Sequence, residues 1–330
     1  MSMRTAGLGR ASKGKSRGRW TAILGIIVFA ALAGFWIASQ RWDRVERVGP
    51  IFPGIAAGIE GSPVDKGAYI YRAAGCAACH TAKGGEELAG GHAFATPFGT
   101  FYSSNITPDP ATGIGGWSDE DLIRAMRKGI GPDGSHYFPA FPYTSYTLMA
   151  DDDIRALKAY LDTVPPVSSA VADHEMAFPL NLLPIGLVRF GMTGWKWLYF
   201  DEGPYRSEAG PAEVVLARGE YLVRGLSHCG ACHTPRNFLG ATKTDNHLEG
   251  AKKGPDGKSV PAIHYHEQKG IGAWQKEDIT FALETGMKPD GDVMGGAMAK
   301  VVEDGTSHLA LDDLNAIAAY LMTLTPEESK

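Results

Sequence analysis

The chain has 330 residues, of which 44% are apolar and 10% aromatic, so it is long enough to bury about two cores of ordinary domain size. Its formal net charge of −5 is distributed unevenly along the chain. Residues 1–47 contain nine Lys and Arg and two acidic residues, whereas the rest of the chain contains 23 basic and 35 acidic residues. That acidic remainder has no basic surface to follow a nucleic-acid backbone, so nucleic-acid binding is excluded.

A basic leader over residues 1–19 precedes an apolar run, Trp20 to Ala38, that contains no charged residue. Its nineteen residues, at about 1.5 Å each, nearly span a hydrocarbon layer of about 30 Å, whereas the apolar part of a signal peptide usually has about 7–15 residues. We therefore expect an uncleaved transmembrane anchor over 20–38, with the leader in the cytoplasm and the rest of the chain across the membrane. The alternative is a cleaved signal peptide, because Ala31-Leu32-Ala33 resembles a cleavage site.

Residues 39–62 contain several prolines and glycines, which predicts a tether between the membrane and the first domain. Regular structure is expected from Asp65, where a short amphipathic helix leads into the sequence Cys76-Ala-Ala-Cys79-His80. The same pattern returns as Cys229-Gly-Ala-Cys232-His233, and the two copies use all four cysteines of the chain.

Two thiols three residues apart, followed directly by an imidazole, are the attachment signature of c-type haem. Each thiol would add to one vinyl group of a haem to form a thioether, and the histidine would ligate the iron. A disulfide framework, a structural zinc site and a redox pair of thiols are the alternatives, but none of them requires a histidine directly after each pair. The sequence therefore predicts two covalently bound haem c groups, at Cys76, Cys79 and His80 and at Cys229, Cys232 and His233.

Short sequences in the first half of the chain recur in the second half, at offsets that rise from 152 to 160 residues. The pairs are Lys66-Gly-Ala-Tyr69 with Arg218-Gly-Glu-Tyr221, Gly113-Ile-Gly-Gly-Trp117 with Gly270-Ile-Gly-Ala-Trp274, and Ala159-Tyr-Leu161 with Ala319-Tyr-Leu321. Such self-similarity indicates two homologous domains that differ by small loop insertions. We place these domains at residues 63–163 and 217–326.

Helix signals agree between the two repeats. Ser118 begins a helix with a capping-box pattern that runs through Lys128, and its partner in the second repeat spans 277–285. A third helix begins near Asp151 with apolar residues at helical spacing, and its partner spans 311–324. The pattern predicts a mainly α chain, with two tandem class I-like cytochrome c domains after one N-terminal transmembrane helix.

A connector over residues 164–216 has no haem motif but is rich in large apolar and aromatic side chains. Prolines interrupt it too often for a second membrane span. We expect the connector to pack across both domains and fix their separation, and a docking surface for a partner subunit is the alternative.

Several longer segments match a known family. Ser104-Asn-Ile-Thr-Pro-Asp109, Phe138-Pro-Ala-Phe-Pro-Tyr143 and the run from Arg218 to Asn237 resemble the membrane-associated cytochrome c subunits of bacterial periplasmic alcohol, gluconate and aldehyde dehydrogenases. The resemblance covers roughly residues 60–325, although many relatives carry three haem groups and this chain has two motifs. It implies a dehydrogenase partner, a membrane quinone or an oxidase as electron acceptor, and an inner-membrane location with the haem domains in the periplasm.

The resemblance also implies the iron ligands. His80 and His233 are expected as proximal ligands, with a methionine sulfur completing each iron, and a filled sixth position leaves no place for a substrate. For the second iron, Met298 stands at the family position in Gly295-Gly-Ala-Met298, with Met294 as the nearby alternative.

For the first iron the ligand is Met149 or none. Some relatives have a methionine where this chain has Phe141, which leaves Met149 as the local candidate and His136 as the second choice. Met149 aligns with Leu309 of the second repeat, so a role in the core is the alternative.

These features predict a non-catalytic electron-transfer subunit that passes electrons from a periplasmic dehydrogenase to the respiratory chain. A di-haem enzyme with one open iron, such as a peroxidase or a thiosulfate dehydrogenase-like protein, is the alternative that Phe141 favours. A soluble carrier released by signal cleavage is a third possibility.

Overall fold

The computed structural model describes Gly25, Val28 and residues 50–207, 213–254, 257–266 and 270–324. Residues 47–330 form one compact unit and residues 1–46 another, so both repeats belong to a single unit. The anchor expected over 20–38 lies outside the described residues, apart from Gly25 and Val28. Within the described ranges, no helix has the length and apolar character needed to cross a membrane.

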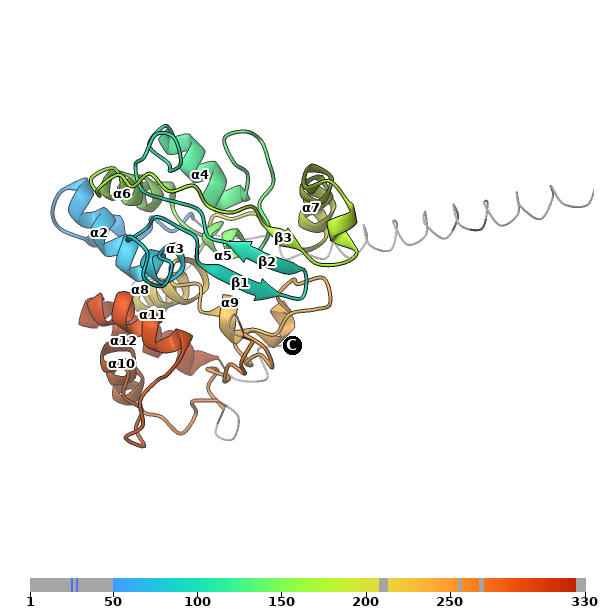
Figure 1. Cartoon of the computed structure of the whole chain (residues 1–330). Coiled ribbons are helices and arrows are strands. Elements are labelled where there is room, and N and C mark those ends of the chain that lie inside the picture. Colours follow the sequence, from blue (N-terminus) through green and yellow to red (C-terminus); the bar gives the residue numbers. More distant parts are fainter. Residues whose placement is uncertain are drawn as a thin grey trace, which may run out of the picture. The chain divides into compact units, whose positions relative to one another are not determined.

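The mainly helical class is confirmed, and the same order of helices occurs twice (Figure 1). The first repeat contains α2 (Pro63–Ala73), α3 (Cys76–His80), α4 (Asp119–Lys128), α5 (Tyr143–Tyr146) and α6 (Asp151–Leu161). The second contains α8 (Val214–Glu220), the π-helical turn η4 (Tyr221–Leu226), α9 (Gly230–His233), α10 (Lys276–Thr285), α11 (Ala297–Asp304), η6 (Thr306–His308) and α12 (Leu311–Thr323). Short 3₁₀ turns complete the helices: η1 (Ala56–Gly58), η2 (Leu180–Leu182) and η5 (Thr244–Asn246).

Local capping explains where the first helices begin. The Ser118 hydroxyl accepts a hydrogen bond from the Asp121 backbone N–H, and the Asp121 carboxylate accepts one from the Ser118 backbone N–H, which is the predicted capping box of α4. Ser62 and Asp65 form the same box in front of α2. That helix therefore begins at Pro63, two residues before the expected start, because proline at the first helical position loses no intrahelical hydrogen bond.

The first and last helices of each repeat cross at a glycine. A Cβ atom on Gly67 of α2 would lie 1.9 Å from the carbonyl oxygen of Ala156, and one on Gly219 of α8 would lie 2.0 Å from that of Ala316. Backbones that approach this closely leave no space for any side chain. The recurring glycine of the two sequence repeats is thus required by the same helix crossing in both.

Two tyrosines exchange hydrogen bonds between the repeats. The Tyr221 hydroxyl donates to the carboxylate of Asp153 over 2.7 Å and accepts from the backbone N–H of Ala150 over 2.9 Å. Tyr69 of the first repeat makes the equivalent bonds to the second repeat: its hydroxyl donates to Asp313 and accepts from the Ala310 N–H over 3.0 Å. The first helical segment of each repeat is therefore fastened to the start of the last helix of the other.

The second half of the expected tether is packed against this compact unit. Ile55 is fully buried, and its N–H and that of Ala56 donate to the Asp153 carboxylate over 2.8–3.1 Å. Ile51 also pairs with Arg206 as an isolated antiparallel bridge. Because a buried carboxylate needs donors, the segment that supplies them is held in place although its composition resembles a linker.

A three-stranded antiparallel sheet, which the sequence did not indicate, joins the first repeat to the connector. The hairpin β1 (Ala93–Thr96) and β2 (Gly99–Tyr102) pairs with β3 (Glu175–Met176) in the order β1-β2-β3. Four-residue strands carry too few residues for a clear alternating pattern, so only the tertiary pairing reveals them.

The connector also forms a helix, α7 (Ile185–Tyr199). This helix contacts both repeats, in agreement with the expectation that the connector packs across them. Lys196 donates from Nζ to the carbonyl oxygens of Lys128 and Gly129 at the end of α4, over 2.6 and 2.8 Å. On the second repeat, Trp195 donates from Nε1 to the carbonyl oxygen of Leu239 over 2.9 Å.

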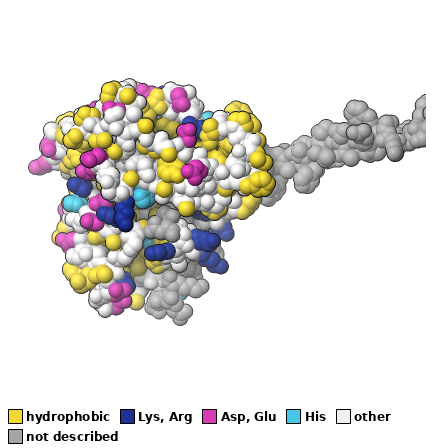
Figure 2. All heavy atoms as spheres, in the orientation of Figure 1, with side chains coloured by type: hydrophobic (Ala, Val, Ile, Leu, Met, Phe, Trp, Pro, Cys, Tyr) yellow, Lys and Arg dark blue, Asp and Glu magenta, His cyan; other side chains and the backbone are white. Residues whose placement is uncertain are grey.

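The outer side of α7 is apolar. Phe190 is 71% exposed and Leu187 52%, and Figure 2 shows hydrophobic side chains gathered where α7 lies in Figure 1. In the usual amphipathic helix the charged residues face solvent and the apolar residues face the core. In α7 the reverse holds for Lys196, which is buried, and for Phe190, which is exposed.

Replacing Gly67 or Gly219 by alanine should destabilise the protein by about 1–3 kcal/mol, because each new methyl group would overlap a backbone carbonyl of the opposing helix. Gly194→Ala in α7 is the matched control: nothing lies within 4 Å of its added Cβ. That change should raise the free energy of unfolding by about 0.5–1 kcal/mol. Denaturant unfolding of the three variants measures the difference, and equal stability of Gly67→Ala and Gly194→Ala would contradict the crossing.

Candidate functional site

Each Cys-x-x-Cys-His motif occupies a one-turn helix. The first motif is α3, and the second is α9 together with Cys229, which precedes it. All four cysteines lie in the described part of the chain, are partly exposed, and form no disulfide. The disulfide framework considered from the sequence is therefore absent from these motifs.

Both motif histidines are oriented by a backbone carbonyl. His80 Nδ1 lies 2.7 Å from the oxygen of Ser104, and His233 Nδ1 lies 2.8 Å from the oxygen of Pro261. A carbonyl oxygen can only accept, so Nδ1 carries the proton and Nε2 keeps its lone pair. This is the arrangement in which an imidazole ligates a metal through Nε2 while its other nitrogen is held by a second group.

The electrostatic environment of these histidines favours the same state. Burial lowers the pKa of His80 and of His233, while the hydrogen bond to the carbonyl opposes the shift. Both rings are therefore held neutral at physiological pH, which is the form that binds iron.

The loop after each motif is folded in the same way. Thr81, directly after the first histidine, accepts from the N–H of Leu88 over 3.1 Å, and Thr234 accepts from the N–H of Leu248 over 3.1 Å. Both leucines have left-handed φ angles, 61° and 60°. The two motifs are thus presented by equivalent backbones, which supports a common function.

The thiols lack the character of a redox pair. Burial raises the pKa of Cys76 to about 12 and that of Cys229 to about 12, whereas redox Cys-x-x-Cys thiols have lowered values. Burial also raises the pKa of Cys79 to about 11, with a further contribution from the charge of Cys232.

Polar atoms without partners surround the second motif. Among the described residues, His247 Nε2, His264 Nδ1 and Ser227 Oγ are buried and make no hydrogen bond. The His247 ring lies close to the motif, since its Cε1 atom is 3.2 Å from the position of a Cβ on Gly230. Buried polar atoms are normally satisfied, so these donors and acceptors fit a bound group that carries polar substituents, as the carboxylates of haem do.

The loop that contains the predicted methionine of the second site matches its counterpart in the first repeat. Met294 donates its N–H to Gly286 and Tyr137 donates to Gly129, over 2.7 and 2.8 Å. The same offset therefore aligns Met298 with Phe141. Met298 is partly buried in the first turn of α11.

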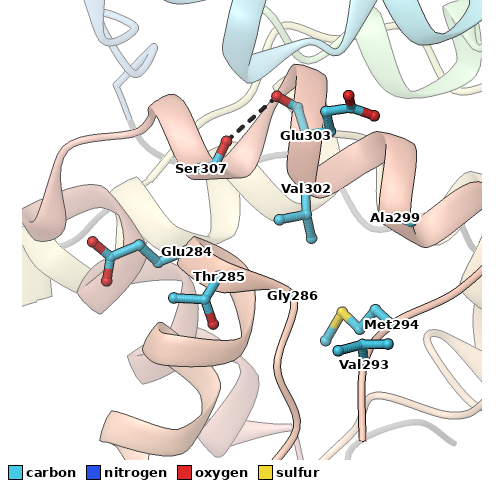
Figure 3. Close-up of a pocket in the computed structure, with 9 residues that line it drawn as sticks. All are labelled: Glu284, Thr285, Gly286, Val293, Met294, Ala299, Val302, Glu303 and Ser307. Atoms are coloured by element: carbon cyan, nitrogen blue, oxygen red, sulfur yellow. Dashed lines mark hydrogen bonds between the residues drawn. The ribbon is translucent and has the colours of Figure 1, made fainter.

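Met294 occupies a different environment. Figure 3 shows it lining a pocket between the end of α10 and α11, together with Val302 and Ala299. It thus has contacts of its own beside α11, and its ligation, like that of Met298, stays a prediction.

The candidates for the first iron are also in place. Met149 is fully buried and donates its N–H to Tyr146, as Leu309 donates to Thr306, so the two occupy the same backbone position. Ligation by Met149 stays a prediction. His136 is engaged with α7: its Nδ1 accepts from Lys196 over 3.0 Å and its Nε2 lies 3.4 Å from the Thr193 hydroxyl.

Sequence reasoning missed the carbonyl groups of Ser104 and Pro261. A backbone acceptor has no side-chain signature, so neither residue type could have indicated it. Ser104 lies 24 residues after His80 and Pro261 lies 28 residues after His233, so no constant spacing from the motif marks them. The two residues do align at the offset of 157 residues that relates Gly113 to Gly270, which is the signal that the repeats carried.

Comparisons with known proteins agree with this geometry. A family model described as cytochrome c matches residues 64–165. A protein of Cereibacter sphaeroides named "Diheme cytochrome c-type" is 42% identical over 91% of this chain and 96% of its own length.

Two further relatives are subunits of larger complexes. The gluconate 2-dehydrogenase cytochrome c subunit of Pantoea cypripedii is 38% identical over 81% of this chain, and the cytochrome c subunit of the alcohol dehydrogenase (quinone) of Gluconobacter oxydans is 37% identical over 79%. The chain spans only 60% and 54% of these two proteins. Together with the paired, equally oriented motifs, these similarities show that the chain belongs to the cytochrome c family and is related to the haem-bearing subunits of dehydrogenases.

Proposed function

We propose that this protein is a membrane-anchored di-haem c-type cytochrome that takes electrons from a periplasmic dehydrogenase and passes them to a membrane quinone or an oxidase. The observation that carries the proposal is the matched pair of imidazoles, each fixed by a carbonyl at Nδ1 and available at Nε2. The family binds haem c, and relatives of this chain are cytochrome subunits of dehydrogenases.

The cysteines would attach the haem groups and the histidines would ligate the irons. Cys76 and Cys79 in one motif, and Cys229 and Cys232 in the other, would hold a haem by thioether bonds. The bound haem supplies reversible one-electron chemistry at its iron. His80 and His233 would ligate through Nε2, and the carbonyl bonds keep both rings from rotating away.

The dehydrogenase partner follows from the relatives, two of which are named as cytochrome c subunits of enzymes that oxidise gluconate and alcohol. In this assignment the chain is a non-catalytic subunit, because a methionine ligand at each iron would leave no open position for a substrate. The substrate is selected by the partner protein.

Phe141 favours a second candidate function, a di-haem enzyme. A phenyl ring occupies the position that Met298 holds in the other repeat, and a phenyl ring cannot ligate iron. Ready binding of carbon monoxide at one iron, together with an unchanged spectrum in Met149→Ala, would support the peroxidase or thiosulfate dehydrogenase-like alternative.

Cys229→Ala should leave one covalently bound haem per chain in place of two, because each thiol pair serves one cofactor. Cys76→Ala is the matched variant for the first motif and should give the same stoichiometry. Haem staining on denaturing gels and pyridine haemochrome quantitation measure it. Two haem groups retained in either variant would refute the assignment of that motif.

Met298→Ala should lower the midpoint potential of one haem and leave the other nearly unchanged, because a thioether ligand favours ferrous iron. Met294→Ala, four residues earlier in the same loop, is the control and should preserve both potentials. Redox titration followed in the visible spectrum distinguishes the two variants. A normal titration of Met298→Ala with an altered one for Met294→Ala would reverse the ligand assignment.

Removal of residues 1–39 and addition of a cleavable signal should give a protein that carries both haem groups and leaves the membrane fraction. The compact unit supplies its own core from Ile55 onward, so folding should not depend on the anchor. Retention in the membrane after a high-salt wash would contradict a single anchor. Loss of that retention in a further Phe190→Asp variant would identify the exposed side of α7 as the second contact.

A further inference from the structure

One side chain lies between the two Cys-x-x-Cys-His motifs. Tyr146, at the end of α5, is 6% exposed, and its hydroxyl donates to the carbonyl oxygen of Ala74, two residues before Cys76, over 3.4 Å. Its ring packs edge-on against the imidazole of His228, with ring centres 5.1 Å apart and planes at 69°. His228 directly precedes Cys229, so Tyr146 contacts the segments that lead into both motifs.

The backbone of His228 is unusual. Its φ angle is 39°, in the left-handed region, where the first repeat has Gly75 at 61°. The two residues are equivalent, because the N–H of Ala231 donates to His228 as the N–H of Ala78 donates to Gly75. A residue other than glycine is strained in this conformation, and such strain persists where the surrounding structure or the function requires that side chain.

Symmetry of the fold does not require this contact. The second-repeat counterpart of Tyr146 is Thr306, whose hydroxyl donates to Leu283 of its own repeat. Tyr146 also packs on Phe141, with ring centres 5.6 Å apart. The aromatic contacts therefore run from Phe141 through Tyr146 to His228, beside the second motif. Among the described residues, Thr306 makes no equivalent ring contact on the other side of the repeat pair.

On the basis of the proposed di-haem function, we propose that Tyr146 and His228 are positioning residues that fix the approach of the two haem groups and form the packed path for electron exchange between them. One electron leaves one iron and reduces the other, so the exchange consumes no further reactant.

The close packing of the Tyr146 and His228 rings is what would speed electron exchange between the two haem groups. Electronic coupling falls steeply across gaps, and a side chain removed from a packed interior leaves either a void or water. Without the two rings, the motif segments would also lose one of the contacts that hold them at a fixed separation, beside the tyrosine–carboxylate hydrogen bonds. Both consequences slow electron exchange while leaving each haem attached.

The test uses the full chain with both haem groups, and it measures the rate at which an electron redistributes between them after flash reduction. His228→Gly restores the residue that the first repeat uses, so it should relieve backbone strain and keep or raise the melting temperature while slowing the exchange several-fold. Tyr146→Leu should also slow it. Tyr146→Phe keeps the ring and should exchange at the wild-type rate.

The two rings should act as one unit. The double variant His228→Gly with Tyr146→Leu should be no slower than the slower single variant, because either change breaks the same contact. His228→Gly that retains two haem groups and exchanges at the wild-type rate would overturn the proposal, and so would additive losses in the double variant. A wild-type protein with fewer than two haem groups would refute the di-haem assignment instead, so the two failures are distinguishable.

Discussion

Two buried carboxylates determine how the repeats of this protein fit together. Asp153 is fully buried and Asp313 is 1% exposed, and a buried charge is costly unless hydrogen bonds surround it. In each case a tyrosine of the other repeat supplies one of those bonds. Burial raises the pKa of Asp153, and its hydrogen bonds oppose the rise. Separation of the repeats would leave both carboxylates short of donors, which agrees with the grouping of residues 47–330 in one compact unit.

The same constraint positions the candidate site. Tyr69 and Tyr221 lie on the helical segments that run directly into the two motifs, so fastening these segments to the opposite repeat also fixes where Cys76 and Cys229 begin. The proximity of the motifs is therefore a consequence of the carboxylate contacts. In the proposed function, electrons would pass between two sites held in one compact unit.

The sequence predicted what local chemistry encodes. The motifs, the repeat offsets and the helix that begins at Ser118 depend on residues adjacent in the chain, and the structure has them as expected. Contacts between distant segments were not predictable: Asp153 reads as an ordinary first-turn acid of a helix, and only the tertiary structure reveals its bonds to Ile55 and Tyr221. The orienting carbonyls and the four-residue strands were hidden for the same reason.

Two differences between the repeats lie at or near the motifs, whereas the helix crossings are alike. Phe141 corresponds to Met298, and His228 corresponds to Gly75. A conserved backbone frame with unlike residues at these points makes the two sites chemically inequivalent. In the proposed function, Met298 would supply a thioether to the second iron, and the first iron would have to take one from Met149, at a different backbone position. The two haem groups would therefore differ in their surroundings and in their potentials.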